Sequence, residues 1–140
     1  MKDIADLMGR IFLSILFFFE AGDTSVYQQM TYKIMTKYGF VWQQEFLYYS
    51  AITVLALGAL LILIGYRSGL GVFLILLYWL PFTFVVYSFW MAPTLEQQHS
   101  EAAMFFKHLA IAGGLLLMYA NGAGKYSVKR LLATTKVSKW

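Results

Sequence analysis

The sequence predicts an all-α fold, a four-helix transmembrane bundle with both termini cytoplasmic. Three observations predict it. The 140-residue chain is 60% hydrophobic and only 13% charged, whereas a soluble domain carries about 25% charged residues. The stretches 46–66 and 68–95 hold no charged side chain, and a helix crosses the hydrocarbon layer with about 20 residues. Basic residues gather at one end of the predicted bundle, which orients it in the membrane.

This composition argues against a soluble enzyme, a disordered tail and a nucleic-acid-binding module. A chain of this length has too small a core to bury so many apolar side chains away from water. The sequence has no cysteine, which excludes a disulfide framework, a thiol relay and a Cys-ligated zinc or iron–sulfur centre.

The first predicted helix covers about residues 4–22 and is the weakest of the four. Its charge-free core, 11–19, begins directly after Arg10. We still predict a span, because this core is too apolar for water and long charged side chains near helix ends can reach the interface. Asp3 and Asp6 argue against a cleaved signal peptide, whose leader is basic.

The second and third predicted helices, about 46–64 and 70–91, are the clearest. The short connection between them, 65–69, begins and ends with glycine, which suits a tight turn between antiparallel neighbours. Pro81 lies inside the third helix and lacks a backbone amide hydrogen, so we predict a kink there. Gly58 is predicted to let the second helix approach a neighbour closely.

The fourth predicted helix covers about 102–120, where Gly113 and Gly114 are also predicted packing positions. The connection 23–45 is long and amphiphilic, and its apolar residues favour a short interfacial helix in the first outer loop. We therefore predict one four-span membrane domain over residues 1–124, followed by a basic cytoplasmic tail over 125–140.

The distribution of charge predicts the orientation. With four spans, both termini and the Arg67 turn share one side, which holds most of the lysine and arginine, while most acidic residues fall on the other side. Basic residues favour the cytoplasmic side. We predict a multi-pass protein of the cytoplasmic (inner) membrane, whose tail lies against anionic lipid.

Arg10, Tyr78 and Trp79 are the candidate ligand- or lipid-binding residues. Helical rise places Arg10 about two turns into the first helix, where an unpaired charge is costly. It either binds an anion or a lipid headgroup inside the bundle, or extends back to the cytoplasmic interface. Tyr78 and Trp79 lie mid-helix beside Pro81, where they could flank an isoprenoid quinone.

Lys107 and His108 are the candidate catalytic residues, although we expect no catalysis by the chain alone. With Glu20, Asp23 and Glu45 they could line a polar outer mouth that binds a small anion or relays protons. Ordinary ion pairing at the interface is the alternative. His99 and His108 are nine residues apart, which places them on opposite helix faces, so we predict no metal site.

Two glycine-containing runs give the chain a family resemblance. Residues 106–117, FKHLAIAGGLLL, and 122–127, GAGKYS, resemble the last helix of the DoxX family, which typically reads Lys-Asn-Leu-Ala, Gly-Gly-Leu-Leu and Gly-x-Gly. Gly9-Arg10 resembles that family's first-helix opening, and the leucine-rich run into Gly65 resembles the end of its second helix.

This resemblance implies an accessory or structural subunit of a larger membrane complex, of a respiratory or redox type. The alternative that it implies is a quinone-linked oxidoreductase subunit of the thiosulfate:quinone oxidoreductase type. We favour the accessory subunit, because His108 stands where the family has Asn and an aliphatic residue near Leu55 replaces an acid. A carrier built on Arg10 and the outer mouth ranks last, since no inverted repeat is visible.

The predicted partners are membrane lipids and other membrane protein subunits, without nucleic acid. The chain alone is predicted to bind no cofactor, and quinone is the one cofactor that the resemblance admits.

Overall fold

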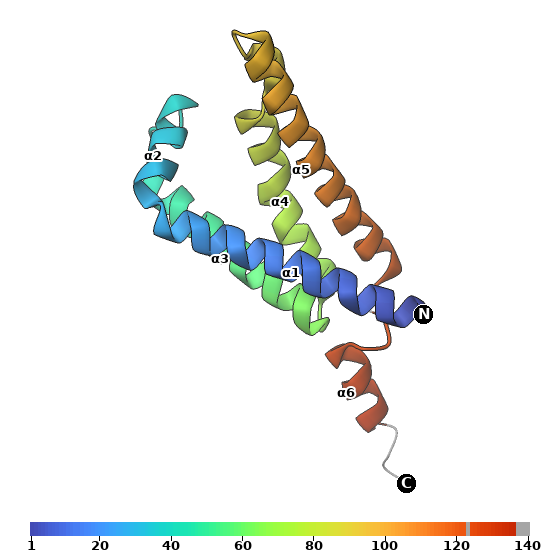
Figure 1. Ribbon diagram of the computed structural model, residues 1–140. Helices are drawn as coiled ribbons and strands as arrows, with labels where there is room; N and C mark the ends of the chain where they lie inside the picture. The colour runs from blue at the N-terminus through green and yellow to red at the C-terminus, as the bar shows by residue number, and fades with distance from the viewer. Residues whose placement is uncertain (123, 137–140) are drawn as a thin grey trace.

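The computed structural model of the protein describes residues 1–122 and 124–136, and in these residues it is helical without strands. Figure 1 shows the arrangement. The elements are α1 (Lys2–Val26), α2 (Gln28–Lys37), α3 (Gln44–Ile64), α4 (Ser68–Val86), the 3-10 turn η1 (Phe89–Met91), α5 (Leu95–Asn121) and α6 (Val128–Lys136). The predicted all-α class is confirmed. The predicted tail contains α6, and its residues 137–140 lie outside the described part of the chain.

α1 runs antiparallel to α3 from about Arg10 to Ser25. Near the start of α1, Arg10 lies against the glycine that directly follows α3. In the middle, the Ser14 hydroxyl donates a hydrogen bond to the Ala59 carbonyl at 3.1 Å. Near the other end, the Tyr48 hydroxyl donates to the Ser25 carbonyl at 3.2 Å.

α3 and α4 form a hairpin whose backbones approach closely at glycine. A Cβ atom placed on Gly58 would lie 2.5 Å from Ile75 Cγ1, and one on Gly71 would lie 2.8 Å from the Gly58 carbonyl oxygen. The packing role predicted for Gly58 is therefore confirmed. A Cβ on Gly113 or Gly114 would meet nothing within 4 Å, so the same prediction is wrong for α5.

Trp79 of α4 joins three helices in the core. Its ring is 1% exposed and packs edge-on against Phe17 of α1, with ring centroids 5.1 Å apart. On the other side it stacks on His108 of α5 at 4.4 Å. The apolar residues around this centre come from α3, α4 and α5 and include Leu55, Ile62, Val72, Ile75 and Leu115.

Three helix boundaries lie four or more residues from the predicted ones. α1 ends at Val26 instead of residue 22. α4 ends at Val86 instead of residue 91, because the chain leaves helical geometry at Tyr87 (φ −103°, ψ 45°) and enters η1. α5 begins at Leu95 instead of residue 102, because the Thr94 side chain caps it by accepting from the Gln97 amide at 3.3 Å. The helix continues through Pro81, and a kink there stays a prediction.

The amphiphilic first connection contains the predicted short helix, α2. The Tyr38 hydroxyl at its end donates to the Val86 carbonyl at 2.8 Å. This bond ties the end of α2 to the end of α4, so α2 is held across that end of the bundle.

Three helices in the described chain are long and apolar enough to cross a membrane: α3, α4 together with η1 as Ser68–Met91, and α5. The prediction of a multi-pass membrane protein is confirmed at this level. α1 is equally long, but its charged side chains keep it out of this group.

The bundle has two ends of different character. We call one the terminal end: the start of α1, the connection 65–67 and the segment 124–136. The Asp3 carboxylate meets the Lys125 ammonium there at 3.4 Å. The opposite loop end comprises the end of α1, α2, the start of α3, residues 87–94 and the start of α5. In Figure 1, α2 and α6 lie at opposite ends of the molecule.

Candidate functional site

A pocket of about 450 Å³ lies at the loop end, between α2 and the second half of α4. α1 and α3 contribute the rest of its wall. Six aromatic side chains line it: Tyr38, Phe40, Tyr78, Trp79, Phe82 and Tyr87. We call this the aromatic pocket.

Two carboxylates from the last turns of α1 also line the aromatic pocket. Glu20 and Asp23 are three residues apart on one helix, which places them on the same face. Glu20 is half-buried, and its charge acts electrostatically on the hydroxyl groups of Tyr78 and Tyr87. Tyr87 in turn lies within electrostatic reach of Tyr38. The pocket thus has an acidic patch surrounded by phenol rings.

Neither carboxylate has a basic partner in the part of the chain that the structure describes. The ion pairs there are Arg10 with Asp6 and Lys125 with Asp3, both at the terminal end. The lining of the aromatic pocket includes no lysine, arginine or histidine. The lining thus holds two acids and no base, while just outside it the Lys37 ammonium lies 5.2 Å from the centre of the Tyr38 ring.

His108 supports the pocket from behind, through Trp79. The Thr83 hydroxyl donates its single hydrogen to the Trp79 carbonyl at 2.7 Å, so the His108 Nδ1, 3.3 Å away, must donate to the Thr83 oxygen. The Trp79 Nε1 donates to the His108 carbonyl at 3.1 Å. These bonds fix the indole ring in the pocket wall.

Lys107 and His108 do not share a site. His108 is 9% exposed and faces the core, whereas Lys107 is exposed on another face of α5. The predicted outer mouth therefore has a different composition. Glu20 and Asp23 line the aromatic pocket without Lys107 or His108. They share it with Tyr78 and Trp79, which were predicted separately as ligand- or lipid-binding residues.

Arg10 is buried, with 1% of its surface exposed. Its guanidinium donates to the Tyr126 carbonyl and its Nε lies 3.7 Å from the Asp6 carboxylate. In this geometry it connects α1 to the segment that follows α5. Binding of an external anion or headgroup by Arg10 stays a prediction.

Four aromatic pocket residues were not predicted from the sequence: Tyr38, Phe40, Phe82 and Tyr87. In a helix running to residue 91, Tyr87 and Tyr78 would point to opposite faces, nine residues apart. Because α4 ends at Val86, Tyr87 turns back toward the same pocket. No sequence pattern indicates this early helix end or the contact between Tyr38 and α4.

Comparison with known proteins gives one family. The model of the SURF4 family matches residues 23–132. No match was found among curated proteins or solved structures.

The predicted membership of the DoxX family is therefore wrong. The runs that suggested it, 106–117 and 122–127, are short combinations of glycine and apolar residues, and close-packed transmembrane helices of many families use such combinations. The two functions taken from that resemblance, the redox accessory subunit and the thiosulfate:quinone oxidoreductase subunit, are withdrawn with it.

Proposed function

The chain belongs to the SURF4 family, and we propose that it binds an amphipathic organic cation in the aromatic pocket at its loop end. An amine or quaternary ammonium attached to an apolar group is the class of ligand that fits this pocket.

One observation carries the proposal. The pocket lining combines two carboxylates, Glu20 and Asp23, with six aromatic rings and includes no basic side chain. A cation over an aromatic face gains roughly 0.5–2 kcal/mol, more where water is excluded. A half-buried carboxylate beside the rings adds a direct Coulomb attraction. An anionic ligand would be repelled by both.

The apolar part of the lining supports an amphipathic ligand. Ile34, Met35, Leu47, Leu77 and Val85 also line the pocket. A volume of about 450 Å³ falls in the usual range of small-molecule sites, roughly 300–1,000 Å³. A ligand with one charged end and one apolar end would therefore match both regions.

We further propose that α1 is a fourth span and that the loop end faces outward. The antiparallel contacts of α1 with α3 from Ser14 to Ser25 support the fourth span. The basic residues at the terminal end support a cytoplasmic location for that end, in the inner membrane. A ligand would then enter from the outer half of the bilayer.

The test is titration of the full chain in nanodiscs of zwitterionic lipid, with empty nanodiscs as the blank. The probes are octyltrimethylammonium, octyl sulfate and octanol, which share a chain and differ in charge. We expect saturable binding of the cation only. Glu20→Gln keeps the shape of the side chain and removes its charge, and we expect its Kd to rise about tenfold, which corresponds to about 1.4 kcal/mol.

Glu45→Gln is the matched control. Glu45 is an exposed acid at the same end of the bundle and is absent from the pocket lining, so its Kd should stay within about twofold of the unsubstituted chain. Equal binding of octanol and the cation, or an unchanged Kd in Glu20→Gln, would contradict the proposal.

A further inference from the structure

A second pocket, of about 560 Å³, lies at the terminal end. We propose that it binds the phosphate group of an anionic phospholipid. Its wall comes from three separate segments: the connection between α3 and α4 with the start of α4, the end of α5, and α6. We call it the basic pocket. It shares no residue with the aromatic pocket, so the two proposals stand independently.

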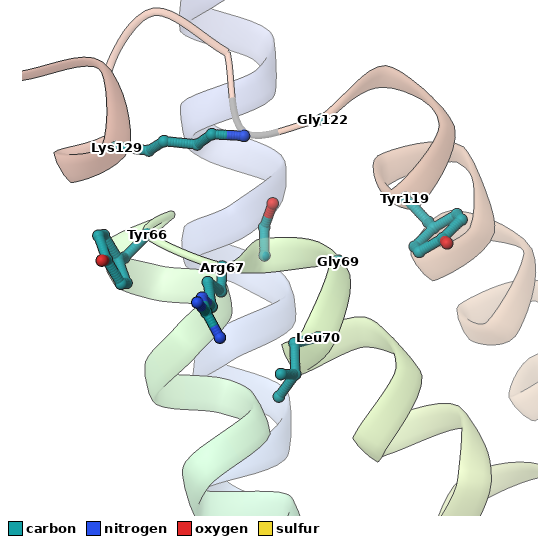
Figure 2. A pocket seen from close by; sticks show the side chains of 8 residues that line it. Tyr66, Arg67, Gly69, Leu70, Tyr119, Gly122 and Lys129 are labelled. Carbon is teal, nitrogen blue, oxygen red and sulfur yellow. The ribbon is translucent and has the colours of Figure 1, made fainter. Parts of the chain in front are cut away.

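Two cations from different elements line the basic pocket. Figure 2 shows Arg67 on the connection before α4 and Lys129 on α6, whose side chain extends toward Gly122. Tyr66 and Tyr119 lie on either side. Arg67 and Lys129 are far apart in sequence, and the fold alone brings them to one cavity.

Among the residues that the structure describes, no acidic side chain neutralises the positive charge of the basic pocket. The acids at this end, Asp3 and Asp6, pair with Lys125 and Arg10. The pocket lining includes no acidic residue, and within residues 1–122 and 124–136 neither Arg67 nor Lys129 forms an ion pair. An anion is the missing complement, and arginine recognises phosphate oxygens through its planar group of donors.

The surroundings identify the phosphate as that of a lipid. Tyr66, Tyr119 and Leu70 line the pocket and are all substantially exposed. Tyrosine at the ends of apolar helices is typical of the interface between membrane and water. Three residues after Leu70 on α4, Phe73 is 61% exposed and offers an apolar surface for acyl chains.

α6 has the character of an interfacial helix. Val128 and Leu132 are exposed apolar residues four positions apart, which places them on one face, while Lys129 reaches the pocket. A basic helix with an apolar stripe lies in the headgroup region of a bilayer. The phosphate nearest to Lys129 would therefore belong to a headgroup.

Native mass spectrometry tests this proposal on the full chain extracted from bilayers that contain equal amounts of phosphatidylglycerol and phosphatidylcholine. Both lipids contain phosphate, but only the first has net negative charge. We expect the chain to retain phosphatidylglycerol preferentially. Arg67→Gln/Lys129→Gln should reduce that preference at least fivefold, and Arg67→Lys/Lys129→Arg, which keeps both charges, should largely retain it.

Lys33→Gln is the matched control, because Lys33 is an exposed cation at the opposite end. Its lipid preference should match that of the unsubstituted chain. An unchanged preference in Arg67→Gln/Lys129→Gln would overturn the proposal, and so would an equal loss in Lys33→Gln. Displacement of the lipid by millimolar inorganic phosphate, but not by chloride at equal ionic strength, would show that the pocket binds a soluble anion. That result would overturn the proposal of a lipid ligand.

We expect these variants to fold, because Arg67, Lys129 and Lys33 are all exposed. Circular dichroism checks this.

Discussion

Arg10 shows how a buried charge acts in this bundle. Its side chain is enclosed, yet it meets a carboxylate from its own helix and a carbonyl from the segment after α5. A charged side chain inside a membrane protein is tolerated where the protein supplies such partners. The arginine therefore connects two segments that are more than a hundred residues apart in sequence.

We predict that Arg10→Gln lowers the free energy of unfolding by about 2 kcal/mol, because it leaves the Asp6 carboxylate without its cation and the Tyr126 carbonyl without a charged donor. Thermal unfolding in detergent, followed by circular dichroism, measures the effect. The exposed Lys33→Gln should change it by less than about 0.5 kcal/mol. Melting of Arg10→Gln at the temperature of the unsubstituted chain would contradict this role.

At the residue scale, the sequence predicted the candidates but not their neighbours. The position of Arg10 inside the first helix followed from counting turns, and its burial required the long-range contact with the carbonyl of residue 126. Tyr78 and Trp79 were selected together, yet Trp79 faces the core against Phe17 while Tyr78 lines the pocket more openly. Side-chain partners from other helices decide these roles, and a single sequence contains no direct record of them.

At the scale of the elements, the hairpin of α3 and α4 depends on glycine at particular positions. Gly71 faces the backbone of α3, and Gly113 faces open space. Small residues stabilise membrane helix pairs only where two backbones meet. The sequence places all of these glycines in apolar helices and does not distinguish them.

We predict that Gly71→Ala destabilises the bundle by about 1–3 kcal/mol, because the added Cβ would lie 2.8 Å from the Gly58 carbonyl oxygen and rigid backbone cannot yield cheaply. Gly113→Ala, the same substitution in α5, should be neutral or stabilise by up to about 1 kcal/mol through helix propensity. The two unfolding temperatures, compared in one detergent, check this. Equal destabilisation of both variants would disprove the assigned packing.

The predicted helix boundaries were close to the observed ones where apolar runs ended abruptly. They were wrong where a capping residue set the boundary. The predicted 46–64 differs little from α3 (Gln44–Ile64), because charged and glycine residues flank the run. α5 begins before its apolar run, since the Thr94 cap and the good helix formers after it extend the helix into polar sequence.

At the scale of the whole molecule, the two ends differ in charge and in what they can bind. The loop end has an acidic aromatic pocket, and the terminal end has a basic one. The composition predicted that the protein lies in a membrane. The distribution of charged residues along the sequence predicted that the two ends differ in charge. The pockets themselves arise from contacts among segments distant in sequence, and periodicity does not specify those contacts.

The most direct test of the account asks whether the aromatic pocket faces outward and holds a cation. The chain has no cysteine, so Thr31→Cys, a position in the pocket lining on α2, provides a single reactive thiol. Ile4→Cys, on the exposed part of α1 at the terminal end, is the control. Intact cells that express each variant are treated with a membrane-impermeant maleimide, with and without octyltrimethylammonium.

We predict that Thr31→Cys reacts from outside and that the cation slows this reaction about tenfold, whereas octyl sulfate at the same concentration leaves it unchanged. Ile4→Cys should react only after the cells are permeabilised. Reaction of Thr31→Cys only after permeabilisation, or equal protection by octyl sulfate, would contradict the account.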